Sequence, residues 1–234
     1  MQIGFLIPAY QAERSIAAVV HGLRFEWARV RGAEACLLCV VDDGSSDRTA
    51  EQARAAGAEL VQHVRNLGKG AALSTGFRRL QELGAETVVA VDADGQHPPE
   101  QAVMLAQHPA PASALLLGVR DLEAAGAPRM NRFSNRFSNR FLSWASGHAL
   151  ADTQCGLRRY PLVTTIELGV RAAGYGFEAE VILRALRRGL SIVEVPVTVI
   201  YPPPSERVSH FHAVRDPAKI VYRVLHTLAT ARHS

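Results

Sequence analysis

The chain alternates short apolar runs with segments in which apolar residues recur at helical spacing. Runs typical of strands fall at residues 3–7, 37–41, 59–63, 87–91 and 114–117. Between the first two runs, one helical stripe is formed by Ile16, Val19, Val20, Leu23 and Trp27. Strands that alternate with helices in this way predict βαβ units and a mostly parallel sheet. We therefore expect an α/β fold, a Rossmann-like three-layer α/β/α sandwich.

The same patterns predict the remaining elements. A helix is expected to end near Ala56, with Ser45, Ser46 or Asp47 as its amino-terminal cap. Further helices are expected at residues 70–83, after 98, from about 162 and at 177–188. Further strands are expected at residues 156–160 and 192–201, the second broken by Pro196. The segment after residue 217 has the pattern of an amphipathic helix, which either packs on the protein or rests on a membrane surface.

Length and composition limit the chain to one core. Its 234 residues, 48% of them hydrophobic, are long enough for one sizeable core and too few for two full domains. Three cysteines cannot form a disulfide framework, and strand alternation points Cys36 and Cys39 to opposite faces, which favours burial over zinc binding. The start lacks a basic leader, so we expect a cytoplasmic protein.

The charge of the chain is compatible with anionic partners. The net charge is +4 and the pI is near 9.2, which suits phosphates or a membrane surface without choosing between them. A nucleic-acid partner is not expected, because the chain has neither a recognition motif nor a long basic tract interleaved with aromatic residues. Residues 101–119 are uncharged but contain Pro109 and Pro111, which argues against a membrane span. Peripheral contact with the inner face of the membrane stays open.

Polar clusters follow three of the predicted strands at the points where those strands end. They are residues 8–10 (Pro-Ala-Tyr), 42–45 (Asp-Asp-Gly-Ser) and 92–94 (Asp-Ala-Asp). Open α/β sheets bind ligands at the carboxyl ends of their strands, so the three clusters together predict one crevice rather than three turns. Within it, Asp42 or Asp43 is a candidate to accept hydrogen bonds from a base or ribose.

Asp92 and Asp94 are candidates for metal binding. Two carboxylates one residue apart at the end of a buried strand suit a divalent cation, because Mg²⁺ is commonly shared between carboxylates and substrate phosphates. The pair therefore predicts a nucleotide substrate that carries a diphosphate.

The glycine-rich segment 66–70 (Asn-Leu-Gly-Lys-Gly) does not match the common phosphate loops. No Ser or Thr follows Lys69, as a Walker loop requires, and Leu73 stands where the dinucleotide fingerprint has its third glycine. ATPase and dehydrogenase functions are both disfavoured. The glycines still allow a ligand to approach the backbone closely, and Lys69 is a candidate to reach a phosphate or a base.

Residues 131–141 contain a four-residue repeat, Asn-Arg-Phe-Ser. On a helix, Arg132, Arg136 and Arg140 drift only slowly around one side and form an arginine ladder. Two interpretations stay open. The arginines bind an anionic acceptor, or they form a solvated face over a core contact lined by the phenylalanines.

Taken together, the motifs resemble the family 2 glycosyltransferases, most closely the branch with dolichyl-phosphate mannosyltransferase and bacterial polyprenyl-phosphate sugar transferases. The matching segments are residues 8–13, 42–45, 66–70, 92–100, 118–120 and 152–158. The resemblance implies a GT-A type fold, a UDP- or GDP-sugar donor and Mg²⁺ or Mn²⁺. It divides the chain into a nucleotide-sugar-binding half (1–120), an acceptor half with a lid (121–212) and a carboxy-terminal amphipathic helix (213–234).

The resemblance also implies roles for individual residues. The nucleotide-sugar pocket would be lined by Pro8, Tyr10, Glu13, Asp42, Asp43, Lys69 and Asp92. The metal would be held by Asp92, Asp94 and Gln96, and Arg120 would face an acceptor phosphate. Arg207 and Ser209 would belong to a lid that closes over the diphosphate, although the glycine usual in that segment is missing.

The expected reaction is sugar transfer with inversion, in which negative charge grows on the departing diphosphate. A metal held by Asp92 and Asp94 would stabilise that charge, so Asp94 counts as catalytic. A hydroxyl acceptor needs a carboxylate base, for which the candidates are Asp152, Glu178 and Glu180. A phosphate acceptor is already an anion and needs only positioning by arginines, for which the candidates are Arg120, Arg132 and Arg136.

We favour the phosphate acceptor, on a polyprenyl phosphate or another lipid at the membrane. Asp152 has an alternative interpretation as a helix cap or as a structural partner of Arg158 or Arg159. Two other functions are carried as alternatives: a sugar nucleotidyltransferase, which normally has a glycine-rich amino-terminal loop that residues 8–11 lack, and a non-catalytic nucleotide-sugar-binding protein.

Overall fold

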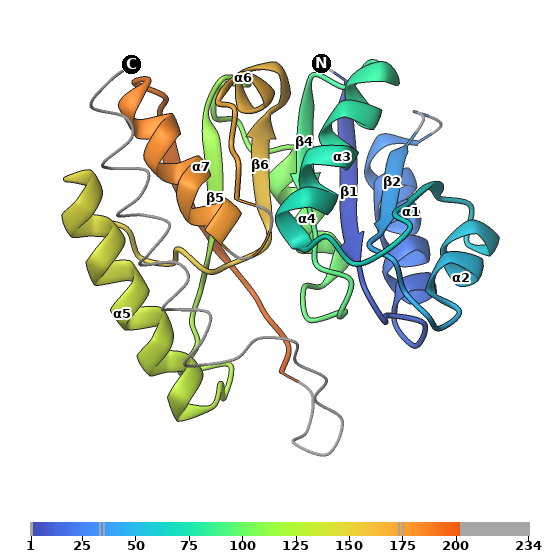
Figure 1. The fold of residues 1–234 in the computed structure, drawn as a ribbon, viewed down its shortest axis with the longest axis horizontal. Helices are drawn as coiled ribbons and strands as arrows, with labels where there is room; N and C mark the ends of the chain where they lie inside the picture. The colour runs from blue at the N-terminus through green and yellow to red at the C-terminus, as the bar shows by residue number, and fades with distance from the viewer. Residues whose placement is uncertain (1, 33, 35, 173, 175, 202–234) are drawn as a thin grey trace.

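The computed structural model describes residues 2–32, 34, 36–172, 174 and 176–201. The strands are β1 (Ile3–Ala9), β2 (Leu37–Asp42), β3 (Glu59–Gln62), β4 (Thr87–Ala90), β5 (Leu115–Arg120), β6 (Arg158–Pro161) and β7 (Ile192–Val197). The helices are α1 (Ile16–Arg31), α2 (Thr49–Ala55), α3 (Lys69–Glu82), α4 (Pro99–Ala106), α5 (Arg129–Ser146), α6 (Leu162–Glu167) and α7 (Gly176–Arg187). Strands and helices alternate along most of the chain, as the sequence predicts (Figure 1).

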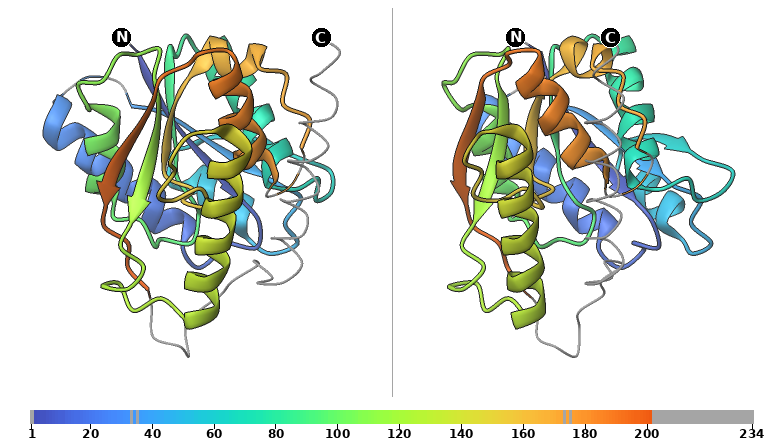
Figure 2. Two further views of the ribbon diagram at one scale, coloured as in Figure 1. Left: turned by 90° about the vertical axis from the view of Figure 1, so that its left-hand side faces the viewer. Right: turned by 60° about the vertical axis from the view of Figure 1, so that its left-hand side comes forward.

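The seven strands form one sheet in the order β3-β2-β1-β4-β6-β5-β7. Strand β6 runs antiparallel to both of its neighbours, and the other pairs are parallel. The carboxyl ends of six strands therefore share one edge, towards which the arrowheads of β5 and β7 point in Figure 2. This confirms the mostly parallel sheet.

Helices cover both faces of the sheet and create two apolar cores. One core joins α1, α2 and α4 to the sheet, with Phe5 and Trp27 in edge-to-face contact at 5.4 Å between ring centroids. The other joins α3, α6 and α7 to the opposite face, where Phe77 contacts Tyr160 at 5.0 Å. The left view of Figure 2 shows the helices on the two sides of the sheet. The three-layer α/β/α prediction is confirmed.

Helix α5 packs against α7 and buries a polar face. Its buried positions are Ser134, Asn135, Ser138, Asn139 and Leu142. Phe133 and Phe137 are 68% and 48% exposed. The interpretation of the repeat as a solvated face over a phenylalanine-lined core contact is therefore wrong for Phe133 and Phe137, because serine and asparagine side chains occupy most of the interior side. Only Phe141, at the end of the repeat, packs against the core.

Three local expectations differ from the structure. The amino-terminal cap of α2 is Arg48, which makes no side-chain capping bond, although the N–H of Thr49 donates to Asp47 Oδ1 at 3.0 Å. Pro196 does not break β7 but lies inside it, since β7 is an edge strand on which a missing N–H is tolerated. The strand ends at Val197 rather than at residue 201.

The cysteines agree with burial. Cys39 lies in the core with α3, and Cys36 packs against the core on the opposite face. All three cysteines of the chain are free, and the described residues contain no group of three or more His, Cys, Asp or Glu side chains that could hold a metal ion by itself.

Candidate functional site

The loops after β1 and β2 are held together at the carboxyl edge of the sheet. The N–H groups of Gln11 and Ala12 donate to Ser45 Oγ and Thr49 Oγ1 at 2.9 and 2.8 Å. Glu13 accepts a hydrogen bond from the N–H of Arg48 at 3.1 Å. Glu13 therefore shapes this side of the crevice by fixing the second loop.

The two aspartates after β2 are buried and already bonded by the protein. Asp42 is 1% exposed and accepts hydrogen bonds from the N–H of Ser45 and from Gln62 Nε2. Asp43 is 2% exposed and accepts hydrogen bonds from the N–H groups of Leu67 and Gly68. Asp43 thereby ties the glycine-rich segment to the end of β2.

Two further contacts fix the glycine-rich segment. His63, the residue after β3, lies 2.6 Å from Asp43 and 2.9 Å from Thr75 Oγ1, so its ring joins the loop after β2 to α3. Gly44 has φ +75°, and a Cβ built on it would lie 2.4 Å from the carbonyl carbon of Arg65. Only glycine permits this approach of two backbones. Residues 66–70 are thus positioned before any ligand arrives.

Lys69 stands between two carboxylates. Its Nζ lies 2.6 Å from Asp92 Oδ1 and 2.8 Å from Glu178 Oε1. Burial opposes the charge of Lys69, but the charges of Asp92 and Glu178 outweigh it and hold the pKa of Lys69 well above its usual value. Burial likewise opposes the charge of Asp92, while Lys69 lowers the pKa of that carboxyl. The structure therefore joins α3, β4 and α7 through one ion-pair cluster.

Asp94 differs from Asp92 in its protonation. Its Oδ1 accepts the N–H of Gln96 at 2.9 Å, and the side chain still reaches solvent. Desolvation by the surrounding chain and the charge of Asp92 raise the pKa of Asp94 to about 6. Asp94 resists ionisation because it is close to the charge of Asp92. A positive charge bound beside the two carboxylates would therefore be favourable.

The surroundings of Asp92 and Asp94 fit a divalent cation shared with a substrate. Gly156 lies so close that a Cβ built on it would lie 2.1 Å from Asp92 Oδ2, so the missing side chain makes room for this carboxylate. Asp92 and Asp94 supply two carboxylates, and Gln96 stands two residues beyond Asp94. Mg²⁺ commonly takes one or two carboxylates and completes its shell with substrate phosphates and water, which suits a pair of this kind.

Asp152 is the most heavily bonded carboxylate at the site. It is 1% exposed and accepts six N–H groups: the main-chain N–H, Nε and Nη2 of Arg120, Nδ2 of Asn135, and the N–H groups of Gln154 and Cys155. Burial alone would raise the pKa of Asp152, but the Arg120 charge and these hydrogen bonds lower it. Its ion-pair partner is Arg120, so the alternative interpretation that paired Asp152 with Arg158 or Arg159 is wrong.

Arg158 and Arg159 are occupied elsewhere. Arg158 donates to the carbonyl oxygens of Thr153, Cys155 and Glu178, and Arg159 donates to those of His108, Ala110 and Pro111. Both are fully buried strand residues. Their guanidinium groups hold main-chain carbonyls of loops and of the first turn of α7 rather than a carboxylate.

A ladder of buried amides connects α5 to the loop that carries Asp152. Asn139 Nδ2 donates to Asn135 Oδ1 at 2.7 Å and also to the carbonyl of Ala151. Its Oδ1 accepts both the N–H and the hydroxyl of Thr153 at 2.8 Å. Gln154 Nε2 donates to Ser138 Oγ at 2.9 Å. The Asn and Ser positions of the repeat therefore clamp residues 151–154.

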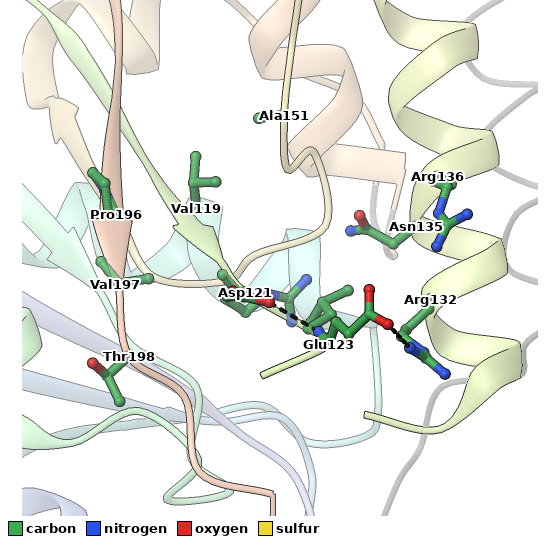
Figure 3. Close-up of a pocket in the computed structure, with 12 residues that line it drawn as sticks. Val119, Asp121, Glu123, Arg132, Asn135, Arg136, Ala151, Pro196, Val197 and Thr198 are labelled. Carbon is green, nitrogen blue, oxygen red and sulfur yellow. Dashed lines mark hydrogen bonds and ion pairs between the residues drawn. The ribbon is translucent and has the colours of Figure 1, made fainter. Parts of the chain in front are cut away.

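A cavity of about 590 Å³ lies between the end of β5, α5 and β7 (Figure 3). Three arginines line it, Arg120 from β5 and Arg132 and Arg136 from α5. Arg132 pairs with the exposed Glu123 at 3.3 Å, as the figure shows. The structure thus brings together the three arginines that the sequence named as candidates for an anionic acceptor.

Residues 5–162 match the family model described as Glycosyl transferase family 2. The chain belongs to glycosyl transferase family 2. This confirms the recognised family and the enzyme class.

Among curated proteins, this family 2 glycosyltransferase is 32% identical to the undecaprenyl-phosphate mannosyltransferase of Micrococcus luteus, over 86% of this chain and 84% of the relative. It is 28% identical to the UDP-N-acetylglucosamine--dolichyl-phosphate N-acetylglucosaminyltransferase of Methanococcus voltae, over 85% of this chain and 86% of the relative. These relatives agree with the polyprenyl-phosphate branch that the motifs indicate.

Among solved structures, the family 2 chain resembles glucosyl-3-phosphoglycerate synthase from Mycobacterium tuberculosis, which was crystallised with Mn²⁺, UDP-glucose and phosphoglyceric acid. The TM-score is 0.67 at 22% identity, over 97% of this chain and 80% of the other. At this identity the likeness shows the GT-A fold alone. Across the part of the chain that the structure describes, no helix is both long and apolar enough to cross a membrane.

The remaining candidates of this family 2 glycosyltransferase lie in different surroundings. Pro8 lies inside β1, paired with Val41, and Tyr10 follows that strand with 37% of its surface exposed. Glu178 reaches the site through Lys69. Glu180 instead accepts hydrogen bonds from Arg184 and from the N–H of Ala172, away from the site side chains. Arg207, Ser209 and the helix expected over 213–234 lie outside the described residues.

Sequence reasoning missed the buried amides. Asn135 and Asn139 of the repeat, and Gln154 of the 151–154 loop, were not among the candidates, which from the repeat included only arginines. A signal was present, since asparagine and serine each recur at four-residue spacing and so form stripes as continuous as the arginine stripe. Nothing in the sequence marks which stripe faces inward.

Proposed function

We propose that this glycosyltransferase transfers a sugar with inversion from a UDP- or GDP-sugar to a polyprenyl phosphate or another membrane-proximal lipid, with a divalent metal. The observation that carries the proposal is the arrangement of charge along the carboxyl edge of the sheet. The charge of Arg120 acts on both carboxyls of the acidic pair, Asp92 and Asp94, and Arg120 also lines the cavity together with Arg132 and Arg136.

The acidic pair supports the donor end of the proposal. Asp92, Asp94 and Gln96 would hold Mg²⁺ or Mn²⁺, which when bound supplies positive charge for the departing diphosphate. Lys69, already 2.6 Å from Asp92, would turn its ammonium towards the same phosphates. The loops fixed by Glu13 and Asp43 would receive the nucleoside beside Pro8, Tyr10 and Asp42.

The acceptor end is supported by the state of Asp152. A general base needs a free lone pair and a pKa near the working pH. Asp152 accepts six N–H groups, and its pKa is lowered. We therefore assign Asp152 to positioning Arg120 rather than to proton removal, which suits an acceptor phosphate that is already ionised.

The names of the relatives support the lipid. The Micrococcus relative is named for undecaprenyl phosphate and the Methanococcus relative for dolichyl phosphate. A lipid acceptor would bring this enzyme to the cytoplasmic face of a membrane as a peripheral protein, in the synthesis of a cell-envelope glycan or glycolipid.

The test is a transfer assay with nucleotide sugars, Mn²⁺ and a short-chain polyprenyl phosphate, with the variant Asp94→Asn. Loss of a carboxylate that would hold the metal beside the leaving diphosphate is expected to reduce turnover by about 10²–10³-fold, the usual cost of one electrostatic contact to developing charge. Glu51→Gln, the same change on the exposed side of α2, serves as the control. Unchanged turnover in Asp94→Asn would refute the proposal.

The products separate the alternatives. Release of a nucleoside diphosphate supports glycosyl transfer, while release of pyrophosphate from a nucleoside triphosphate and a sugar phosphate indicates a nucleotidyltransferase. Nucleotide-sugar binding without transfer to any acceptor indicates a binding protein. A thermal-shift screen of nucleotide sugars with Mn²⁺ identifies the base, because a ligand that binds only the folded state raises its stability.

A further inference from the structure

Helix α5 buries mainly polar side chains and exposes large apolar ones, the opposite of a helix that only covers a core. Its interior side holds Ser134, Ser138, the two bonded asparagines and, of the apolar residues, Leu142. Its outer side exposes Met130 by 55%, Phe133 by 68%, Phe137 by 48% and Trp144 by 73%. In water this exposed surface is unfavourable, and contiguous exposed apolar surface marks an interaction site.

The exposed residues form one surface rather than scattered contacts. On a helix of 3.6 residues per turn, Phe133, Phe137 and Trp144 fall on one side, with Met130 beside them and Arg136 and Arg140 at its margin. We call these six residues the α5 outer face. Figure 2 shows α5 at the outside of the molecule, on the side of α7. Aromatic side chains flanked by arginines match the composition of helices that lie in a membrane interface.

The positive charge of α5 favours a partner with an anionic surface. The helix contains four arginines and neither Asp nor Glu. Arg136 and Arg140 are exposed, and among the described residues no carboxylate forms an ion pair with either. A second copy of this chain would bring the same arginines face to face, which like charges oppose. Anionic lipid head groups complement them.

We propose that the α5 outer face docks this enzyme on an anionic lipid bilayer, with the aromatic side chains at the boundary between head groups and acyl chains. Arg132, Asn135 and Arg136 of the same helix line the 590 Å³ cavity. Arg136 belongs both to the α5 outer face and to the cavity lining, so docking would place the cavity beside the lipid surface. The inference deepens the proposed lipid acceptor by naming the surface that meets the membrane.

The chain contains its own fluorescent probe for this contact. Of its two tryptophans, Trp27 is 1% exposed and Trp144 is 73% exposed. Adding vesicles of phosphatidylcholine and phosphatidylglycerol to the full chain is expected to shift the emission of Trp144 to shorter wavelength. Vesicles of phosphatidylcholine alone should shift it less, and added salt should weaken the shift. The variant Trp144→Phe should lose the shift while the protein still sediments with vesicles.

The double variant Phe133→Ser and Phe137→Ser tests the apolar part of the face. Each phenylalanine is expected to contribute about tenfold to vesicle partitioning, which is about 1.4 kcal/mol, since an interfacial contact buries only part of the side chain. Phe25→Ser is the matched control, because Phe25 on α1 is also 68% exposed but lies outside the α5 outer face. It should bind vesicles as the unaltered chain does. Circular dichroism establishes that all variants fold.

Several outcomes would overturn the inference. They are no sedimentation with anionic vesicles at low salt, an equal loss in Phe25→Ser, or Trp144 emission that is already blue-shifted and shielded from acrylamide without vesicles. The last result would mean that another segment of this chain covers the face. A shift that depends on protein concentration, with dimers in sedimentation velocity, would assign the face to a second copy.

Vesicle binding is measured without a nucleotide sugar, whereas the transfer assay uses a short-chain polyprenyl phosphate without vesicles. Failure of docking and failure of the proposed function are therefore distinguishable.

Discussion

The proposed donor and acceptor sides of the carboxyl edge use charge in opposite ways. On the proposed donor side, Asp94 reaches solvent with its pKa raised to about 6, beside a second carboxylate held by Lys69. On the proposed acceptor side, the carboxylate of Asp152 is buried with its pKa lowered, and the cavity is lined by three arginines together with Asp121 and Glu123. Added positive charge is therefore favoured beside Asp94, whereas the carboxylate of Asp152 is already neutralised by its partners. The difference teaches that two aspartates near Arg120 can have unlike roles. The number of hydrogen bonds that each carboxylate already accepts from the protein decides which role it can take.

The variant with the largest expected effect on this comparison is Asp152→Asn. An amide in that place leaves Arg120 buried beside a neutral group, which is expected to reduce the free energy of unfolding by about 3–5 kcal/mol. Urea denaturation measures the loss. The control is Asp121→Asn, at an exposed carboxylate that bonds only nearby N–H groups. If Asp152→Asn kept full stability but lost transfer to a hydroxyl acceptor, Asp152 would be a base after all.

A second variant, Gly156→Ala, tests the donor side. Its new Cβ would meet Asp92, so the carboxylate must move, and a displacement of about 1 Å commonly costs about 10²-fold in rate. The measurement is kcat/KM for the nucleotide sugar with Mn²⁺. Gly174→Ala provides the control, since nothing lies within 4 Å of a Cβ at that position. Equal activity of the two variants would mean that the position of Asp92 is not critical.

The amide ladder offers a smaller test on the acceptor side. Asn139→Ala removes both hydrogen bonds to Thr153, and leaving buried polar groups unpaired is expected to cost about 1–3 kcal/mol of unfolding free energy. Asn131→Ala, at the partly exposed first asparagine of the repeat, should change stability far less. Similar losses in both variants would show that the ladder does not hold the 151–154 loop.

The mildest test is the pH dependence of the donor side. Asp94 must be ionised to hold a cation, so with its pKa at about 6, kcat/KM at limiting Mn²⁺ should fall about tenfold per pH unit well below that value. Raising the Mn²⁺ concentration should shift this fall in kcat/KM to lower pH, because the cation competes with the proton for Asp94. A profile that stays flat down to pH 5 would contradict the role of Asp94.

The sequence predicted the parts of the site that follow directly from strand ends. Asp42, Asp92 and Arg120 each stand at or just after the end of a strand in the mostly parallel sheet, and the topology brings those ends to one edge. Their neighbourhood follows from chain continuity and strand direction. The sequence could not predict that Glu180 turns towards Arg184 while Glu178 reaches Lys69, because both positions lie on one helix and only packing decides which side each occupies.

By itself, the sequence determined the α/β order of elements, the family and the acidic pair, since periodic patterns and residues at strand ends are local properties of the chain. Only the tertiary structure decided the orientation of α5. In a helix with a four-residue repeat, the arginine, phenylalanine, serine and asparagine stripes run side by side, and local propensity does not favour one of them for the interior. The 151–154 loop decides it, because its carboxylate and main-chain groups need hydrogen-bond partners once buried. That requirement turns the asparagines inward and leaves Phe133 and Phe137 outside.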